Sequence, residues 1–546
     1  MLLCAWQAKG QRSPISGKGA ACGRAGKFVQ EGMSELFPAL VISSLSHDGR
    51  GIARTPGGVV FVEGALPGQT VRARLLRRKA RFAEARCEAV EQPGPEERPA
   101  LCPHQEDCGG CPWQRLSRPA QLRWKVRLLC DALQRIGKFA APPPEDILFA
   151  SEESAFRNKM EFAFGTAADA ADGSDETGGP ERLCLGLRRR GGLSVLAVPG
   201  CRLLPPETLA VVRTAEHLAR ELSARDRSLC AYRPPARQRD GAAGGGGTSA
   251  RSGTGFWRFL VLRRGLPPDS PLTPQAALAQ PESWRAWAVC LTSPGNARQQ
   301  AAVRALGEEL LRRHTHLAGF VHEERRSDDA LAQGEARVCC LSADGRHGAG
   351  AALLRLPLAG EWFTLDAASF FQVNTTAAQL LAREAVERLL SAVFPGGPGA
   401  PAGKLLDIYC GVGAPGLLAG RHFAETLGLE YDARAVNLAR CNAAALGCRG
   451  QWLAGDAGRL LARRRERPGH FAAALVDPPR AGMDGRALDA LLALRPPHIL
   501  YISCNPATLA RDGARLASAY ALHALRPVDL FPHTPHLETV SLWQRR

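Results

Sequence analysis

The stretch KLLDIYCGVGAPGLLAG, residues 404–420, decides the fold of the C-terminal part of the chain. An apolar run of strand length leads to Asp407, and Gly411, Gly413 and Gly416 then form a GxGxxG turn that opens an apolar helical segment. Glycine is needed where the backbone must approach a bound ligand closely. The turn alone is a weak signal for a nucleotide pocket, so its surroundings have to support it.

Five further runs of strand length follow this turn, with a helical pattern between most of them. They are TLGLEYD (426–432), QWLAGDA (451–457), AALVDPP (473–479), HILYISC (498–504) and TVSLWQ (539–544). Short strands that alternate with helices predict βαβ units and a mostly parallel, doubly wound sheet. We therefore predict an α/β, Rossmann-like domain over residues 361–546.

Carboxylates stand where the strands of this predicted sheet end. Glu430 lies 17 residues after Gly413, where a carboxylate can accept hydrogen bonds from ribose hydroxyls. We expect Asp456, after the next strand, to reach an adenine, and Asp477 to lie at the carboxyl edge, stiffened by two following prolines. A dinucleotide-binding dehydrogenase shares these features. A dehydrogenase would not explain why a thiol, Cys504, stands at the end of the following strand, at the same crevice.

The length and charge of the chain bound the remaining possibilities. A chain of 546 residues predicts two to four domains. A net charge of +17 favours a polyanionic partner such as nucleic acid, although a GC-rich genome also explains many arginines. No apolar run reaches the roughly 18 residues of a membrane span. The N-terminus lacks the charge-then-apolar order of a secretory signal, so we expect a soluble, cytoplasmic, monomeric protein with no membrane partner.

The N-terminal two thirds divide into three predicted parts. Residues 1–33 are expected to be a disordered tail or a start-site extension, because a domain-like pattern starts near residue 34. Residues 34–95 alternate apolar and polar positions between Gly/Pro turns, which predicts a small β-barrel. This segment resembles the TRAM domain, an OB-like RNA-binding barrel. Residues 96–360 are predicted to form a mixed α/β central domain with disordered Gly/Ser-rich insertions at 165–180 and 237–255.

One group of cysteines stands out among the 17 in the chain. Cys102, Cys108 and Cys111 are five and two residues apart, and Gly109 and Gly110 allow a tight turn between the last two. Three thiolates without a histidine at zinc-finger spacing suit an iron–sulfur cluster or a cysteine-only zinc site. For the fourth ligand we expect Cys201, which follows a Pro-Gly turn; Cys184 is the second candidate.

Several ordered motifs resemble one enzyme family. CGGCPWQ, SFFQVN, DIYCGVG, DPPRAGM, SCNPATLARD and FPHTPHLETV occur in the order found in the RNA 5-methyluridine methyltransferases that use S-adenosylmethionine. The resemblance covers nearly everything from residue 34 onward apart from the insertions. It implies methyl transfer to carbon 5 of a uridine, a class I methyltransferase domain and, for the type that carries a 4Fe-4S cluster, 23S ribosomal RNA as substrate.

The resemblance also assigns roles to single residues. Carbon 5 of uracil is a poor nucleophile until a thiolate adds at carbon 6, and Cys504 is the expected thiolate. The family motif makes Glu538 the base that removes the carbon 5 proton. The residues expected to line the cofactor pocket are Gln372, Tyr409, Gly411, Gly413, Glu430, Asp456 and Asp477, although Asp477 can instead hold the uracil. Arg157 and Lys159 of FRNKMEF are expected to contact RNA, with a solvated charged face as the alternative.

Three alternatives remain open from the sequence. The RNA can be a tRNA instead of ribosomal RNA. An iron–sulfur methylthio-transfer or redox enzyme can also carry a TRAM domain, although the cysteine spacing is not that of radical adenosylmethionine enzymes. A non-catalytic RNA-binding protein would keep the barrel and lose the chemistry.

Overall fold

The computed structural model describes residues 36–166, 183–234 and 253–546, except 191, 193, 346–347, 398, 400, 402 and 465–466. The chain forms two compact units, one ending at Arg98 and one running from Pro99 to Arg546. The predicted tail at 1–33 and nearly all of the insertions at 165–180 and 237–255 lie outside the described residues. Among the helices of the described part, none has the length and apolar character to cross a membrane.

The first unit is a closed five-stranded barrel in the order β1-β2-β3-β5-β4, as the alternation at 34–95 predicted. Alternate residues such as Val60, Val62 and Val71 fill its interior, while the residues between them face outward. Among the outward arginines, Arg72 pairs with a glutamate on the neighbouring strand. The strands are β1 (Leu36–Leu45), β2 (Gly51–Thr55), β3 (Gly58–Glu63), β4 (Thr70–Arg78) and β5 (Phe82–Gln92).

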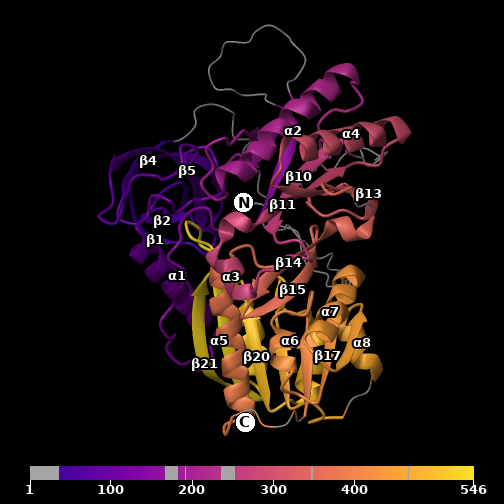
Figure 1. Ribbon diagram of the computed structural model, residues 1–546. Coiled ribbons are helices and arrows are strands. Elements are labelled where there is room, and N and C mark those ends of the chain that lie inside the picture. Colours follow the sequence, from indigo (N-terminus) through magenta and orange to yellow (C-terminus); the bar gives the residue numbers. More distant parts are fainter. Residues whose placement is uncertain are drawn as a thin grey trace, which may run out of the picture. The chain divides into compact units, whose positions relative to one another are not determined.

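The second unit contains a seven-stranded sheet in the order β13-β12-β11-β10-β7-β8-β9. Helices α2 (Pro206–Arg225) and α4 (Ala297–Arg313) lie side by side over one face of this sheet (Figure 1) and bury its apolar residues. Asn296 starts α4 with a capping box, in which Gln299 is the reciprocal partner. The strands are β7 (Lys159–Thr166), β8 (Leu183–Arg188), β9 (Val195–Leu196), β10 (Trp257–Gly265), β11 (Arg285–Thr292), β12 (Leu317–Glu324) and β13 (Ala336–Ser342).

Short elements connect this sheet to the C-terminal one. They are α3 (Pro274–Ala279), the 3-10 turns η2 (Pro281–Ser283) and η3 (Ala349–Ala352), and a hairpin of β14 (Leu353–Leu358) with β15 (Glu361–Asp366). The hairpin packs against α5 (Thr375–Val393) and α7 (Ala433–Ala445). The predicted boundary at residue 360 therefore falls inside this hairpin, between its two strands.

The C-terminal sheet has eight strands in the order β18-β17-β16-β19-β20-β22-β21-β6, and it confirms the predicted doubly wound α/β fold. All neighbours pair in parallel except β22, which is antiparallel to both β20 and β21. The sequence did not predict β21, whose apolar pattern is interrupted by polar residues. The strands are β16 (Lys404–Ile408), β17 (Glu425–Glu430), β18 (Gly450–Ala454), β19 (Ala473–Val476), β20 (His498–Ser503), β21 (Tyr520–Asp529), β22 (Glu538–Arg545) and β6 (Leu148–Phe149).

Helices cover both faces of this sheet, which explains why its strands are apolar on both sides. Leu406 and Ile408 of β16 face a core with α8 (Ala457–Arg464), α9 (Gly485–Leu494) and α10 (Pro506–Leu516). Leu405, which precedes Leu406 and points to the opposite face of the sheet, packs against α5 and α6 (Gly416–Gly420) instead. In Figure 1, α7 and α8 lie near β17 at one side of the sheet, and β21 lies at the other side.

One segment lies elsewhere than the sequence assigned it. Helix α1 (Arg118–Ala132) and the π-helical turn η1 (Leu133–Gly137) fall inside the predicted central domain, 96–360. In the structure, Leu129 and Leu133 join the core under α10, and β6 extends the C-terminal sheet beside β21. The sequence could not assign this helix correctly, because apolar periodicity identifies a helix and its buried face but does not say which sheet that face covers.

Candidate active site

The GxGxxG turn leaves β16 and brings the backbone close to a buried carboxylate. A Cβ atom at Gly416 would lie 1.8 Å from Oδ2 of Asp407, so only glycine fits there. Gly411 (φ +54°) and Gly413 (φ +101°) adopt positive φ values that favour glycine. Tyr409 also has a positive φ, +68°, a strained conformation that the sequence did not predict.

Glu430 lies beside this turn, at the end of β17. Its Oε2 accepts a hydrogen bond from the Gly411 N–H at 3.1 Å, and its Oε1 accepts one from the Asp432 N–H at 2.9 Å. Asp456 follows β18 and caps α8, where it accepts a hydrogen bond from the Arg459 N–H at 2.8 Å. The predicted ribose-binding carboxylate therefore touches the glycine turn directly.

Three carboxyl groups lie close together around the turn. Burial, then Asp477, then Glu430 raise the pKa of Asp407 well above its ordinary value. Burial, followed by Glu430, raises the pKa of Asp477 to about 7. Such a cluster favours a cationic ligand, because a positive charge relieves the repulsion between the carboxylates.

Cys504 and Glu538 lie at the end of the β20–β22 ladder, Cys504 just after β20 and Glu538 at the start of β22. Ser503 pairs with Thr539 at the end of the antiparallel ladder. Cys504 and Glu538 are the next residue on each side of this pair, and Glu538 is close enough to raise the pKa of the Cys504 thiol. Residues opposite each other in such a ladder have Cα atoms roughly 4.5–5.5 Å apart. The sequence places each residue at a strand end, but only the antiparallel pairing brings the two together.

The local sequence Cys504-Asn505-Pro506 has a clear structural role. The Asn505 side-chain oxygen accepts a hydrogen bond from the Ala507 N–H at 3.0 Å and so caps α10, which begins at Pro506. The Asn505 amide also donates to the Arg480 carbonyl at 3.1 Å. The helix therefore starts immediately after the thiol, and Cys504 stays at the carboxyl edge of the sheet next to the DPPR segment.

The electrostatics of Cys504 and Glu538 depend on each other and on the DPPR segment. Burial, then Glu538, raise the pKa of the Cys504 thiol well above its ordinary value, and Arg480 opposes this rise. Burial, followed by Asp477, raises the pKa of Glu538 to about 8, again against Arg480. A thiol, two carboxyls and one guanidinium thus share one site.

Arg480 was not among the residues selected from the sequence. It lies three residues after Asp477 in the quoted DPPRAGM motif, and this spacing is the signal that could have identified it. Its charge favours the thiolate form of Cys504 and the carboxylate form of Glu538, the two forms that nucleophilic and base chemistry require.

Gln372 lies in the segment before α5, and the central sheet holds that segment in place. The Asn158 side-chain amide donates to the Gln372 carbonyl at 2.9 Å, and the Asn158 N–H donates to the Val373 carbonyl at 2.7 Å. The fully buried Arg263 of β10 donates to the Ser369 carbonyl of the same segment. Asn158 and Arg263 were not predicted, because their partners are more than a hundred residues away.

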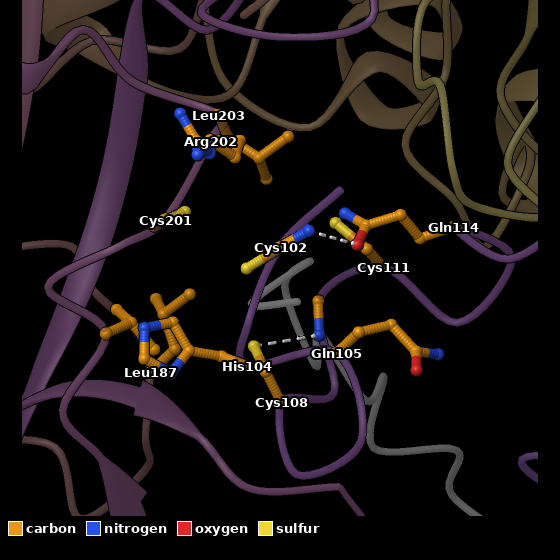
Figure 2. A pocket seen from close by; sticks show the side chains of 12 residues that line it. Cys102, His104, Gln105, Cys108, Cys111, Gln114, Leu187, Cys201, Arg202 and Leu203 are labelled. Atoms are coloured by element: carbon orange, nitrogen blue, oxygen red, sulfur yellow. Dashed lines mark hydrogen bonds between the residues drawn. The ribbon is translucent and has the colours of Figure 1, made fainter. Parts of the chain in front are cut away.

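The four predicted metal-binding cysteines line one pocket. Figure 2 shows Cys102, Cys108 and Cys111 from one loop and Cys201 from a separate turn around a common space. Burial, then Cys201 and Cys108, raise the pKa of Cys111 to about 12, and burial is also the main reason why the pKa of Cys201 rises to about 11. Cys184, the second candidate, lies in β8 and does not line this pocket.

The pocket suits thiolate ligands chemically. The Gly110 N–H donates to the Cys108 sulfur at 3.4 Å, and the guanidinium of Arg157 is close enough to favour the thiolates of Cys111 and Cys201. His104 uses its Nε2 to accept from the Gly200 N–H at 3.2 Å. With the side chains as placed, no three His, Cys, Asp or Glu residues of the described chain converge closely enough to hold a metal ion.

The two residues expected to contact RNA lie in different surroundings. Arg157 is half-buried beside the cysteine pocket, and its backbone pairs with Asn374. Lys159 forms an ion pair of 3.1 Å with Glu161, and its side chain is 13% exposed. In this arrangement each cation already faces protein groups, and an RNA phosphate would have to compete with them.

Comparisons with known proteins agree with this geometry. The profile of a family described as tRNA (uracil-5-)-methyltransferase matches residues 467–546, and that of the TRAM domain matches residues 40–87. An uncharacterized RNA methyltransferase of Nitratidesulfovibrio vulgaris is 37% identical over 92% of this chain and 95% of its own. One of Chlorobaculum tepidum is 31% identical over 90% and 92% of the two chains.

A solved structure shares the fold. The tRNA (uracil-54, C5)-methyltransferase of Pyrococcus abyssi, in complex with S-adenosyl-L-homocysteine, superposes with a TM-score of 0.61. It is 21% identical and covers 92% of this chain and all of its own. This likeness supports the class I methyltransferase fold of the C-terminal sheet.

Proposed function

This chain belongs to the S-adenosylmethionine-dependent RNA (uracil-5-)-methyltransferases, and from that premise we propose that it methylates carbon 5 of a uridine through a covalent adduct between Cys504 and carbon 6. The observation that carries the proposal is the pairing of Ser503 with Thr539, which brings the adjacent Cys504 and Glu538 into one site, where Glu538 raises the pKa of the thiol. A nucleophile and a base on adjacent strand ends can act on neighbouring atoms of one pyrimidine ring.

The proposed reaction consists of an addition, a methyl transfer and an elimination. The Cys504 thiolate adds to carbon 6, and the electron pair of the carbon 5–carbon 6 double bond moves into the ring as an enolate. S-adenosylmethionine supplies the methyl group: carbon 5 bonds to the methyl carbon, and the methyl–sulfur bond breaks. The Glu538 carboxylate then removes the carbon 5 proton, the double bond re-forms and the thiolate leaves.

The cluster of carboxyl groups at the glycine turn supports this choice of cofactor. A sulfonium is a cation, and Asp407, Glu430 and Asp477 surround the turn with carboxyl groups whose mutual repulsion it would relieve. We assign the nucleoside pocket to Tyr409, Gly411, Gly413, Glu430 and Asp456, and the methionine end to Gln372. Asp477 lies between this pocket and Glu538, so it can face either the cofactor or the uracil.

Cys504→Ala tests the proposed nucleophile. We expect this variant to form no covalent adduct with RNA that contains 5-fluorouridine, because the adduct requires the sulfur–carbon 6 bond. In the unchanged chain the adduct should persist, since fluorine cannot leave as a proton does. Denaturing electrophoresis of the RNA–protein mixture with S-adenosylmethionine measures the adduct. Cys441→Ala, which changes an exposed cysteine on α7, is the control and should retain the adduct; an adduct retained by Cys504→Ala would remove Cys504 from the mechanism.

We further propose that Cys102, Cys108, Cys111 and Cys201 hold a 4Fe-4S cluster. Four thiols that line one pocket, with a backbone N–H and the Arg157 guanidinium nearby, support cysteine ligation. The proposed methyl transfer needs no oxidant or reductant, so these residues would serve the structure or the positioning of RNA. Analysis of iron and acid-labile sulfide in anaerobically prepared protein tests the assignment.

For the RNA we propose 23S ribosomal RNA in the cytoplasm, with tRNA as the alternative. The resemblance to cluster-bearing family members supports this order, and the TRAM barrel supports an RNA partner of either kind. Mapping 5-methyluridine in both RNAs from a strain that lacks the gene, before and after complementation, distinguishes them. Loss of the modification from tRNA alone would reverse the order.

A further inference from the structure

The loop between β21 and β22, residues 530–537, delivers Glu538 to the site, and buried polar residues of α1 hold it. At its start, the Lys125 ammonium donates to Asp529 Oδ1 at 2.6 Å and to the Phe531 carbonyl at 2.8 Å. Arg118 pairs with the other oxygen of Asp529. Lys125 and Asp529 are fully buried, so this end of the loop cannot shift without separating a buried ion pair.

The middle of the loop contains a strained residue. His533 has a φ of +68°, the left-handed region that non-glycine residues adopt at a cost of about 1–3 kcal/mol. Such a conformation persists only where its surroundings impose it. The His533 N–H donates to Gln121 Oε1 at 2.8 Å, and the His533 carbonyl accepts from the Trp113 N–H at 2.9 Å.

Gln121 can present only one atom to this loop. It lies one helical turn before Lys125 and is fully buried. Its side-chain nitrogen donates to the Trp113 carbonyl at 3.2 Å and to the Leu116 carbonyl at 2.8 Å, so its oxygen must face His533. Trp113 comes two residues after Cys111. The hydrogen bond from the Trp113 N–H to the His533 carbonyl therefore connects the cysteine segment to the loop that carries Glu538.

We propose that Gln121 is a positioning residue for proton abstraction, because it holds His533 in the left-handed conformation and thereby sets where β22 presents Glu538. The inference rests on the proposed function. Gln121 touches neither RNA nor cofactor in this role. Its loss should slow elimination of the methylated adduct while adduct formation continues.

Gln121→Met removes the hydrogen bonds and keeps the length of the side chain. With unmodified substrate RNA and S-adenosylmethionine, we expect the methylated covalent adduct to decay about tenfold to a hundredfold more slowly than in the unchanged chain. The rate of adduct formation should stay within about threefold, since Cys504 directly follows β20 and is not on this loop. Rapid quench followed by denaturing electrophoresis measures both rates.

Gln379→Met is the matched control. Gln379 is also a buried helical glutamine that donates to two carbonyls and accepts from one N–H, but its partners are near β14 and α5. It should lower the unfolding temperature without slowing adduct decay. Equal adduct decay in Gln121→Met and Gln379→Met would overturn the inference.

A pair of substitutions at His533 decides the matter if Gln121→Met does not fold. His533→Asn and His533→Val both remove the imidazole, but asparagine tolerates the left-handed region and valine does not. We expect slow adduct decay in the valine variant only. Similar decay in both variants would contradict the inference, whereas absence of any adduct in the unchanged chain would contradict the proposed function itself.

Discussion

Glu538 and Asp477 are carboxyl groups whose pKa burial raises into the neutral range. The pKa of Glu538 is raised to about 8 and that of Asp477 to about 7, while the adjacent Arg480 opposes the rise at Glu538. A base must first lose its proton, so the deprotonated fraction of Glu538 falls tenfold for each pH unit below about 8. Motif spacing identified both carboxyls in the sequence, but their raised pKa follows from burial that only the packed sheet creates.

This sign gives a pH dependence for the last step of the proposed reaction. In the unchanged protein we expect decay of the preformed methylated adduct to accelerate as pH rises from 6 and to level off near pH 8. Single-turnover decay after a pH jump measures this step without the contribution of Cys504 ionisation. The methylated adduct of the Glu538→Gln variant should decay slowly at every pH. An unchanged pH profile in that variant would assign the proton transfer to another group.

At the scale of elements, the sequence predicted where most helices and strands lie but not which strands pair with each other. Asp407 and the GxGxxG turn follow directly from the strand–turn–helix pattern, because ligand approach demands glycine locally. The sequence did not predict that β22 pairs antiparallel to β20, because an isolated apolar run such as 539–544 carries no information about its partner strand. That antiparallel pairing joins Ser503 to Thr539 and so brings the adjacent Cys504 and Glu538 into one site.

Gly416→Ala tests the close approach at the start of α6. A methyl group there would collide with the buried Asp407 carboxyl, at 1.8 Å from Oδ2. We expect loss of S-adenosylmethionine binding and a decrease of about 1–3 kcal/mol in the free energy of unfolding. Isothermal titration and urea denaturation measure the two effects.

Gly485→Ala is the control for this substitution. Gly485 also begins a helix, α9, but a Cβ atom there would meet nothing closer than Arg515 at 4.0 Å. Its affinity for S-adenosylmethionine should equal that of the unchanged chain. If the two alanine variants bound the cofactor equally well, the glycine turn would not have the close packing described here.

At the scale of the second unit, a buried ion network connects its two large sheets. Glu323 of β12 is fully buried, and its Oε1 accepts from Arg337 of β13 and from Arg434 of α7, each at 2.8 Å. Arg337 also donates to Asp366 of β15 at 2.6 Å. Helix α7 packs against β17 and β18, so the network joins the central sheet to the cofactor-binding sheet.

Glu323→Gln should separate the stabilities of these two sheets. The substitution leaves two partly exposed guanidinium groups without their shared carboxylate, so we expect a cost below the roughly 3–5 kcal/mol of breaking a fully buried pair. We expect thermal unfolding, followed by calorimetry, to change from one transition to two. Glu308→Gln, which removes an exposed partner of Arg304 on α4, should change the free energy of unfolding by less than about 1 kcal/mol. A single unshifted transition in Glu323→Gln would contradict the role of the network.

The sequence by itself determined the α/β fold, the barrel and the residue types of the site, because glycine turns, alternating strands and motif cysteines are local properties of the chain. Only the tertiary structure decided which residues meet. The pairing of β20 with β22, the packing of α1 on the C-terminal sheet and the contact of Gln121 with His533 join residues far apart in the chain. These contacts arise from burial of apolar faces whose partners no local pattern specifies.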